Sequence, residues 1–344
     1  MNQIGDIDYT PFSRRLQPLP AGGGFCMEDY WVWCGSVIRG EDGRYHMFAA
    51  RWPKNLKFLP AYQSYSEVVR AVADTPEGPY IYQETVLPDR GAGFWDGRMT
   101  HNPTIHKADG QYVLFYIGST FEGERPTAEE LRNGPDFYPC YRSIRIGVAT
   151  APSVYGPWKR RDEPFLTARP EAWDAWVVTN PAPCFLPDGR LFLYYRSYVK
   201  AEQRNKIGLA IFEGLDGRSR WRSDGPVFDS SAVTVEDPYV FNIDGHFEML
   251  AKDLNGKACG EFHAGVHLLS PDGIVWNMAG QPKAYSRTVT WDNGTQETLS
   301  SVERPQLLFH DGVPTHMFAA MADGDAAHKW QNMTRTWTGV VPLA

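Results

Sequence analysis

The chain has 344 residues and a formal net charge of −7 at pH 7, so it offers no basic surface of the kind that nucleic acid requires. No apolar run approaches the roughly 18 residues that cross a membrane, so we expect neither a nucleic-acid nor a membrane partner. The 32 Gly, the 26 Pro and the 14% of aromatic residues are typical of a turn-rich, all-β protein.

The N-terminal residues Met1–Asp8 have neither the basic segment nor the apolar segment of a signal peptide. We therefore expect a cytoplasmic protein, although a secreted protein whose signal has been removed would begin in the same way. The five cysteines are an odd number and lack metal-ligand spacing. They predict free, mostly buried thiols in a reducing compartment rather than a metal site.

In chain order, the sequence repeats one apolar hairpin five times, and each copy turns at an Asp-Gly pair. Asp-Gly favours a tight turn because Gly adopts positive φ without steric cost. The five turns are Asp42-Gly43, Asp109-Gly110, Asp188-Gly189, Asp244-Gly245 and Asp311-Gly312. Seven or eight residues before each turn, a residue pair opens the first strand: Gly35-Ser36, Asn102-Pro103, Asn180-Pro181, Asp237-Pro238 and Arg304-Pro305.

Five copies of an antiparallel unit predict an all-β fold, a five-bladed β-propeller in which each blade is a four-stranded sheet. A β-sandwich with coincidental turns is the alternative, but the strand starts repeat as well as the turns. We expect a single domain, 1–344, with blades at roughly 26–82, 83–161, 162–228, 229–285 and 286–344. Residues 1–25 would close the ring against the last blade or wrap over one face. The longest irregular stretch, 120–142, is expected to form a lid or a pocket wall.

An Asp recurs six residues before three of the strand starts, as Asp29, Asp96 and Asp174. An Asp that recurs in three blades is expected to cap the turn that enters the inner strand. Asp29 differs, since no Trp precedes it and its blade lacks the Asn-Pro or Asp-Pro start. This difference makes Asp29 a candidate functional carboxylate.

The innermost strands of a propeller begin near its axis, so the strand starts should converge at one end of the central channel. The ends of the second strands and the starts of the third strands should join them there. The candidate substrate-binding residues at this end are Glu236, His101, Asn102, Asn180, Arg51, Trp52, Arg196, Asp253, His263 and Arg304.

Three candidate carboxylates, Glu236, Asp237 and Glu303, belong to the same end of the channel. Glycoside hydrolysis needs one carboxyl that stays protonated and a second that activates water or attacks directly. Neighbours in a regular strand point to opposite sides, so Glu236 and Asp237 share one side only where the strand is irregular, and Pro238 allows this. Alternatively, Glu236 forms a salt bridge to a neighbouring blade, for example to Arg304.

These residues resemble a known group of proteins. The Glu236-Asp237-Pro238 start with its Asp-Gly hairpin, the two Asn-Pro starts and the Glu303-Arg304-Pro305 start are similar to motifs of the five-bladed propeller glycoside hydrolases. That group comprises families 43, 62, 32, 68, 117 and 130, and families 43 and 117 are the most similar. The resemblance spans residues 26–330. It implies an inverting mechanism, with carboxyl groups roughly 6.5–9.5 Å apart.

The resemblance also implies roles for individual residues. Asp29 would match the general base of the first blade, although family 43 would have its Asp at the position of Gly35. Asp237 would tune the pKa of the acid, and Glu303 would be the acid. In family 117 a His is implicated in place of the acid, and His263 is the candidate. Family 43 members often hold a calcium ion on the axis near a His, here His101 or His263, but we predict no metal and no required cofactor.

The sequence therefore predicts a glycosidase that cleaves plant or algal oligosaccharides, exo-acting and inverting, as a monomer or a homo-oligomer. A non-catalytic carbohydrate-binding propeller is one alternative, and it would not need clustered carboxylates. A glycoside phosphorylase of the same fold is another, with a phosphate pocket formed by Arg51, Arg70, Arg142 and Arg145. A protein-interaction propeller fits less well because of the long 120–142 stretch.

Overall fold

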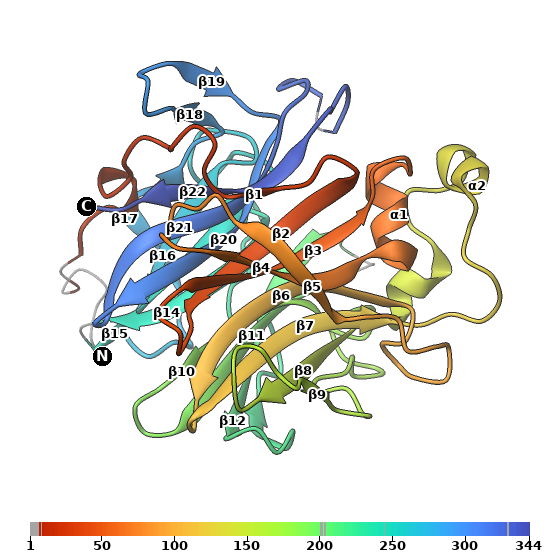
Figure 1. Cartoon of the computed structure of the whole chain (residues 1–344). Coiled ribbons are helices and arrows are strands. Elements are labelled where there is room, and N and C mark those ends of the chain that lie inside the picture. Colours follow the sequence, from red (N-terminus) through yellow and green to blue (C-terminus); the bar gives the residue numbers. More distant parts are fainter. Residues whose placement is uncertain (1–6, 8, 200–201, 203, 244, 329) are drawn as a thin grey trace.

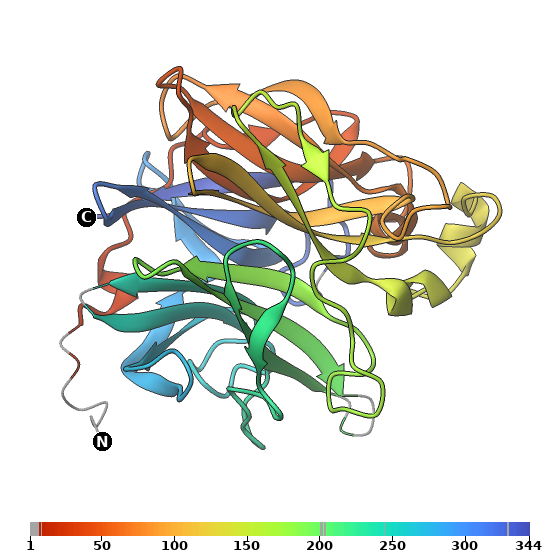
Figure 2. The same cartoon turned by 90° about the horizontal axis from the view of Figure 1, so that it is seen from below.

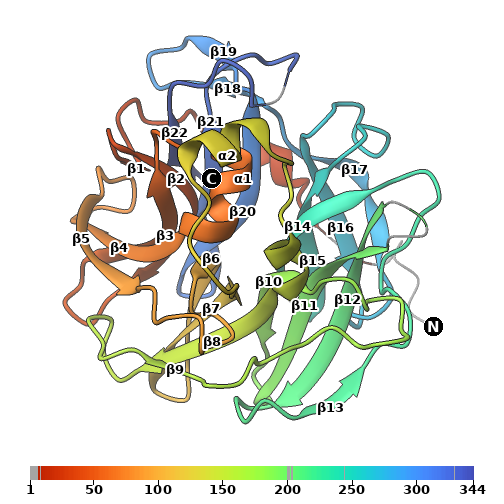
Figure 3. The same ribbon diagram turned by 90° about the vertical axis from the view of Figure 1, so that its right-hand side faces the viewer.

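The computed structural model describes residues 7, 9–199, 202, 204–243, 245–328 and 330–344. Five four-stranded antiparallel sheets surround a central axis, and this arrangement confirms the predicted five-bladed β-propeller (Figures 1 and 3). In each predicted turn the Gly has a positive φ, from 72° at Gly110 to 86° at Gly189, as a tight turn requires. Asp244 of the fourth turn lies outside the described residues.

The first four blades each run from the inside of the ring to the outside in chain order. Blade one is β2 (Tyr30–Arg39), β3 (Tyr45–Pro53), β4 (Glu67–Ala73) and β5 (Ile81–Leu87). Blade two is β6 (Met99–Ala108), β7 (Gln111–Ser119), β8 (Arg145–Ala151) and β9 (Lys159–Arg160). Blade three is β10 (Thr179–Phe185), β11 (Arg190–Val199), β12 (Arg204–Glu213) and β13 (Ser219–Arg222). Blade four is β14 (Val235–Ile243), β15 (His246–Asp253), β16 (Gly265–Ser270) and β17 (Asn277–Tyr285).

Blade five joins the two ends of the chain. It consists of β20 (Ser301–His310), β21 (Val313–Ala322), β22 (Thr336–Pro342) and the early strand β1 (Phe25–Cys26). β1 pairs antiparallel with β22, with Phe25 opposite Thr338. The chains approach so closely there that a Cβ on Gly24, whose φ is 78°, would lie 2.0 Å from the Thr338 carbonyl oxygen. The N-terminal segment thus supplies the outermost strand of the last sheet and closes the ring.

Short elements outside the sheets complete the fold. They are the helices α1 (Phe58–Tyr65) and α2 (Ala128–Asn133), the 3-10 turns η2 (Phe12–Arg14) and η3 (Pro139–Ser143), and the hairpin β18 (Thr288–Thr290) with β19 (Gln296–Thr298). α2 lies in the predicted irregular stretch 120–142, whereas α1 and the hairpin were not expected. α1 and α2 lie at one end of the propeller, and the C-terminal end lies at the other (Figures 1 and 2).

Each inner strand carries a β-bulge at the same place. The register of pairing shifts there, and one residue adopts a left-handed backbone with φ between 50° and 57°. The five bulge residues are Cys34, Asn102, Asn180, Asp237 and Arg304. In blade one the bulge residue is therefore Cys34, one position before the expected Gly35. Six residues before Cys34 stands Glu28, so Asp29 is not the equivalent of Asp96 and Asp174.

Asp96 and Asp174 have the same structural role in blades two and three. Both side chains are fully buried, and each forms ion pairs with two arginines. Each also accepts a hydrogen bond from a core tyrosine, Tyr116 for Asp96 and Tyr195 for Asp174. These carboxylates hold the polypeptide that enters the inner strand, in agreement with the structural role expected for a recurring Asp.

Hydrophobic side chains fill the spaces between adjacent blades. Between blades two and three, for example, Phe115, Leu193 and Phe212 are completely buried in one cluster. Burial of each side chain of this size stabilises the folded state by about 1.5–3 kcal/mol. This packing makes the ring rigid, so the inner strands can present side chains at fixed positions.

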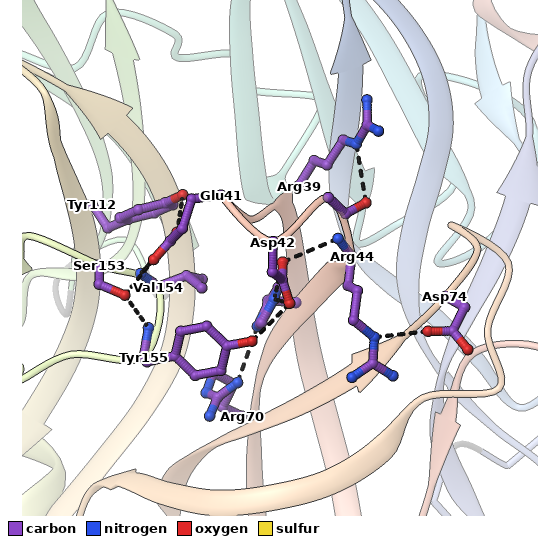
Figure 4. Close-up of polar contacts among 12 residues, drawn as sticks. Arg39, Glu41, Asp42, Arg44, Arg70, Asp74, Tyr112, Ser153, Val154 and Tyr155 are labelled. Carbon is purple, nitrogen blue, oxygen red and sulfur yellow. Dashed lines mark hydrogen bonds and ion pairs between the residues drawn. The ribbon is translucent and has the colours of Figure 1, made fainter.

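The tip of the first hairpin links blades one and two at the end of β2 that lies away from the bulge (Figure 4). The Glu41 carboxylate accepts hydrogen bonds from the hydroxyls of Ser153 and Tyr112, and Asp42 accepts one from the Tyr155 hydroxyl at 2.7 Å. Burial alone would raise the pKa of Glu41, but the hydrogen bonds from Ser153 and Tyr112 outweigh it and lower this pKa to about 2. The carboxylate therefore fastens the turn to the neighbouring blade.

We expect Glu41→Gln to lower the free energy of unfolding by about 1 kcal/mol at pH 7, because solvent screening reduces the value of a largely exposed carboxylate. A lowered pKa stabilises the fold above the unfolded value near 4.5, and this stabilisation is lost as the pH falls toward 2. Urea unfolding should therefore show a smaller difference in the free energy of unfolding between the wild type and Glu41→Gln at pH 3 than at pH 7. The exposed Glu163→Gln variant is the control, and an equal loss at both pH values would contradict the prediction.

Candidate active site

A small pocket of about 130 Å³ opens at the axial end where the five inner strands begin. Residues of the inner strands form its floor. Aromatic side chains form its wall, and they come from blade one, from α1, from the 120–142 stretch and from the loop before β22: Trp33, Trp52, Phe58, Tyr62, Phe137, Tyr141 and Trp330. Figure 3 shows α1 and α2 in front of the axis at this end. The 120–142 stretch thus supplies part of a pocket wall.

Lys252 is the centre of the floor. Its ammonium nitrogen lies 2.9 Å from a Glu236 oxygen, 3.1 Å from an Asp237 oxygen and 2.8 Å from a Glu303 oxygen. The lysine side chain is 2% exposed. Because all three oxygens contact one nitrogen, no two of them are more than about 6 Å apart. The structure thus brings together the three carboxylates that the sequence grouped, from blades four and five.

The β-bulge explains how neighbouring residues reach the same lysine. In a regular strand Glu236 and Asp237 would point to opposite faces. Asp237 has a φ of 57°, and the register shifts between Glu236 and Tyr239, so both carboxylates turn to one side. The same shift pairs Glu236 with Lys252 rather than with Asp253. The end of this second strand was expected at the channel, but only Asp253, and not its neighbour Lys252, was among the predicted site residues.

Burial and charge act against each other in this cluster. Burial raises the pKa of Asp237, and so do the neighbouring carboxylates Glu236 and Glu303, while Lys252 and Arg304 lower it, with a net rise. Burial alone would lower the pKa of Lys252, but the three carboxylates hold it well above its usual value. Lys252 is therefore charged at neutral pH, and Asp237 retains its proton to a higher pH than an exposed Asp.

Arg196 forms an ion pair with the other carboxylate oxygen of Glu236, and its Nε lies 3.4 Å from Glu236 Oε1. It also donates hydrogen bonds to the Tyr141 hydroxyl and the Asn205 side chain, both at 2.7 Å. The pocket lining thus contains three cationic side chains, those of Arg196, Lys252 and Arg304, beside the three carboxyl groups. These cations lower the cost of burying the carboxylates.

His101 belongs to a hydrogen-bonded group below the aromatic wall. Its Nδ1 lies 2.8 Å from the Ser66 hydroxyl, and its Nε2 lies 3.7 Å from the Cys34 sulfur. Burial and, to a smaller extent, the nearby positive charge of Arg304 together lower the pKa of His101 to about 3. The Cys34 thiol donates to the Asn102 carbonyl oxygen at 2.8 Å, and burial raises the pKa of Cys34 well above its usual value. His101 is thus a neutral, positioned side chain of the pocket.

Seven of the predicted substrate-binding residues line the pocket: Glu236, His101, Asn102, Asn180, Trp52, Arg196 and Arg304. Two of the three predicted catalytic residues, Asp237 and Glu303, do so as well. The strand position brought both Lys252 and Asp253 to this end, and the bulge in β14 decides that Lys252 is the residue opposite Glu236. Tyr62 and Tyr141 come from segments without a repeat pattern, so no signal in the sequence placed them.

Four predicted residues lie outside the pocket lining, and this corrects their expected positions. Asp29 is exposed, and its carbonyl oxygen accepts a hydrogen bond from the Lys54 amide. Arg51 turns into blade one, where it pairs with Glu67 at 2.8 Å.

Asp253 is buried, and its carboxylate accepts hydrogen bonds from backbone amides of the following loop, those of Asn255, Gly256, Ala258 and Cys259. His263 follows that loop, and its ring stacks on Phe262. Both residues shape the loop after β15 rather than the pocket.

The four arginines considered for a phosphate pocket do not converge there either. Arg51 and Arg70 form ion pairs within blade one, with Glu67 and Glu84. Arg142 lies over the Trp176 ring, and Arg145 donates to backbone carbonyls of its own segment. The cations that line the pocket are Arg196, Lys252 and Arg304 instead.

The axial end does not fit a calcium ion. Calcium requires six to eight oxygen ligands, whereas here an ammonium group lies between the carboxylates. Within the described part of the chain, no group of three or more His, Cys, Asp and Glu side chains is arranged to hold a metal ion. Likewise, no described helix is long and apolar enough to span a membrane.

No family model matches this chain, and neither does any curated protein. Among solved structures, it is similar to a family 117 glycoside hydrolase of the marine bacterium Zobellia galactanivorans (TM-score 0.63, 13% identity, 96% of this chain and 89% of that one). It is also similar to the catalytic domain of a Coprinopsis cinerea family 62 α-L-arabinofuranosidase (TM-score 0.61, 12% identity, 97% and 98%). A thermostable family 43 glycoside hydrolase gives a TM-score of 0.59 at 11% identity, over 92% and 90%. The chain therefore shares the fold of the five-bladed propeller glycoside hydrolases that its motifs resemble.

Proposed function

We propose that this protein is a glycoside hydrolase that removes a terminal sugar from plant or algal oligosaccharides. The observation that carries the proposal is the meeting of Glu236, Asp237 and Glu303 on one buried lysine, at the floor of an aromatic-walled pocket. Clustered carboxylates are costly to bury, and they supply the acid and the base or nucleophile of glycoside hydrolysis. The shared fold with glycoside hydrolases of three families supports the same activity.

The environments of the carboxylates suggest different roles. Asp237, whose pKa is raised by burial, is the carboxyl that keeps a proton to the higher pH, and it serves as the acid. The Glu236 side chain is the most exposed of the three, at 20% compared with 5% for the other two, and it meets the substrate as the carboxylate. The Lys252 ammonium group remains in contact with the negatively charged carboxylates while Asp237 transfers its proton to the substrate.

The spacing of the cluster bears on the stereochemistry. Inverting glycosidases need carboxyl groups roughly 6.5–9.5 Å apart, while retaining enzymes need about 5–5.5 Å. The contacting oxygens here are at most about 6 Å apart, and Asp29, the expected base, lies outside the pocket. This geometry favours retention over the inversion that the family resemblance implied.

The pocket size supports cleavage from a chain end. Its volume of about 130 Å³ is well below the roughly 300–1,000 Å³ of sites for drug-sized ligands, so it suits one sugar ring. Phe58, Phe137 and Trp330 close its sides. A pocket closed in this way takes a terminal residue more readily than the middle of a chain.

A carbohydrate-binding propeller without catalysis is the second candidate. The observation in its favour is that each carboxylate of the cluster already has a cationic partner, and that the bulge of blade one carries Cys34 instead of an acid. Such a protein would bind a sugar through the same aromatic wall.

Hydrolysis of aryl glycosides and defined plant and algal oligosaccharides tests the proposal. We expect the wild-type protein to release a monosaccharide from one of these substrates, and NMR of the first product should show the retained anomer. Release of internal fragments would contradict end-acting cleavage. Binding of a sugar without any cleavage across the panel would favour the non-catalytic propeller.

A further inference from the structure

The five left-handed bulge residues form a ring around the axis, and four of them bond in pairs across adjacent blades. Cys34 of blade one donates to Asn102 of blade two at 2.8 Å. Asn180 of blade three donates to Asp237 of blade four. The ring has an odd number of members, so Arg304 of blade five is left between two completed pairs.

The Arg304 side chain is 2% exposed and lines the pocket. Its nearest charge contact is Asp237, at 3.7 Å, which is too long for a hydrogen bond, and the Cys34 sulfur is its one weak hydrogen-bonding neighbour. Among the described residues, none of its three guanidinium nitrogens has an oxygen or nitrogen acceptor within hydrogen-bond distance. A buried guanidinium carries five N–H groups and is costly to leave without acceptors.

The other cations of the floor are already engaged. Lys252 contacts three carboxylates, and Arg196 contacts Glu236, Tyr141 and Asn205. Arg304 is also the long, charged member of a ring whose other positions carry short side chains, and a left-handed backbone is uncommon for a residue other than Gly, Asn or Asp. These features single out Arg304 as the group that faces a ligand rather than the protein.

We propose that Arg304 binds an oxyanionic group in the pocket, and that the ligand is an acidic sugar whose carboxylate meets the guanidinium. The planar guanidinium matches a carboxylate or a phosphate through two parallel hydrogen bonds. Free phosphate is the other source of the same chemistry. The inference rests on the proposed function only in naming the ligand a sugar, and it specifies the substrates as glycosides of uronic acids.

The test measures binding, so that it does not depend on turnover. Full-length protein is titrated calorimetrically with glucuronate, galacturonate, glucose, galactose and inorganic phosphate. We expect a uronate to bind roughly 10–100-fold more tightly than its neutral counterpart, as a charge-assisted hydrogen bond provides. Arg304→Gln should remove this preference, so that the uronate and its neutral counterpart bind with similar affinity.

Two further variants keep the test decisive. Arg51→Gln removes a buried arginine that lies outside the pocket, and it should retain the uronate preference. Arg304→Lys keeps the charge but loses the paired hydrogen bonds, so it should show an intermediate preference even if Arg304→Gln does not fold.

Each outcome has a distinct meaning. Binding of phosphate but not of uronates, lost in Arg304→Gln, supports the oxyanion site with phosphate as its source. Equal binding of acidic and neutral sugars, without phosphate binding, overturns the inference whatever the protein hydrolyses. Uronate binding without hydrolysis of any glycuronide or neutral glycoside keeps the inference and refutes the proposed function.

Discussion

Asp237→Asn is expected to lower kcat/KM on the best glycoside substrate by roughly a hundredfold or more, because it removes the proton that the acid must deliver. Asn preserves the shape of the side chain and tolerates the left-handed backbone at this bulge, where φ is 57°. The measurement is steady-state kinetics on the substrate that the hydrolysis panel identifies. Asp109→Asn is the matched control, since Asp109 also has a left-handed backbone, with φ of 50°, but lies in a hairpin turn outside the pocket.

The stability of Asp237→Asn separates a catalytic role from a structural one. A carboxyl whose pKa is raised in the folded state disfavours folding once the pH exceeds its unfolded value near 3.8. Removing its charge should therefore leave the melting temperature at pH 7 within about 3 °C of the wild type. The wild-type pH profile should lose activity above the raised pKa, and the variant should lack this limb. If Asp237→Asn had full activity, the catalytic group would have to lie elsewhere in the propeller.

Lys252→Met should have the largest effect on stability, a loss of about 3–5 kcal/mol at pH 7. The substitution leaves three carboxylates, of which Asp237 and Glu303 are buried, with contacting oxygens within about 6 Å of one another and without their shared cation. The raised pKa of Lys252 means that its stabilising effect is complete at pH 7 and declines only above its unfolded value near 10.5. In the variant, the carboxylates can take up protons as the pH falls, so part of the loss should be regained near pH 4.

Lys206→Met is the control for this prediction. Lys206 also contacts two carboxylates, Glu202 and Asp229, but these are about one-third exposed. Solvent screening should limit its loss to about 1 kcal/mol. Urea unfolding of both variants at pH 7 and pH 4 provides the comparison. If Lys252→Met costs no more than Lys206→Met, or if its loss does not change with pH, Lys252 does not hold the cluster together.

The fold was predictable because its determinants are local. Each Asp-Gly turn defines a hairpin by the φ that Gly can adopt, and Gly110 and Gly189 have the expected positive values. Five similar hairpins cannot bury their faces alone, so they must stack around an axis. The convergence of Asp237 and Glu303 at one end follows from that geometry, which is why the two carboxylates could be grouped from the sequence.

The details of the site depend on contacts between distant residues. The bulge in β14 moves the pairing by one residue, and this exchanges Asp253 for Lys252 at the floor. The same effect in β2 makes Cys34 the bulge residue in place of the expected Gly35. A one-residue change of register reverses which side chains face inward. The register is set by the hydrogen bonds between the strands, which join residues that are distant in the sequence.

The sequence by itself determined the all-β class, the number of blades and the two strands that bring carboxylates to the axis, because turn chemistry and hydrophobic alternation act over short distances. Only the tertiary structure decided which neighbours those carboxylates have. Lys252 meets Glu303 of the next blade, α1 supplies Tyr62 to the wall, and Arg304 stands between two bonded pairs of the ring. These contacts join residues far apart in the chain, so they depend on how the blades pack around the axis rather than on any local pattern.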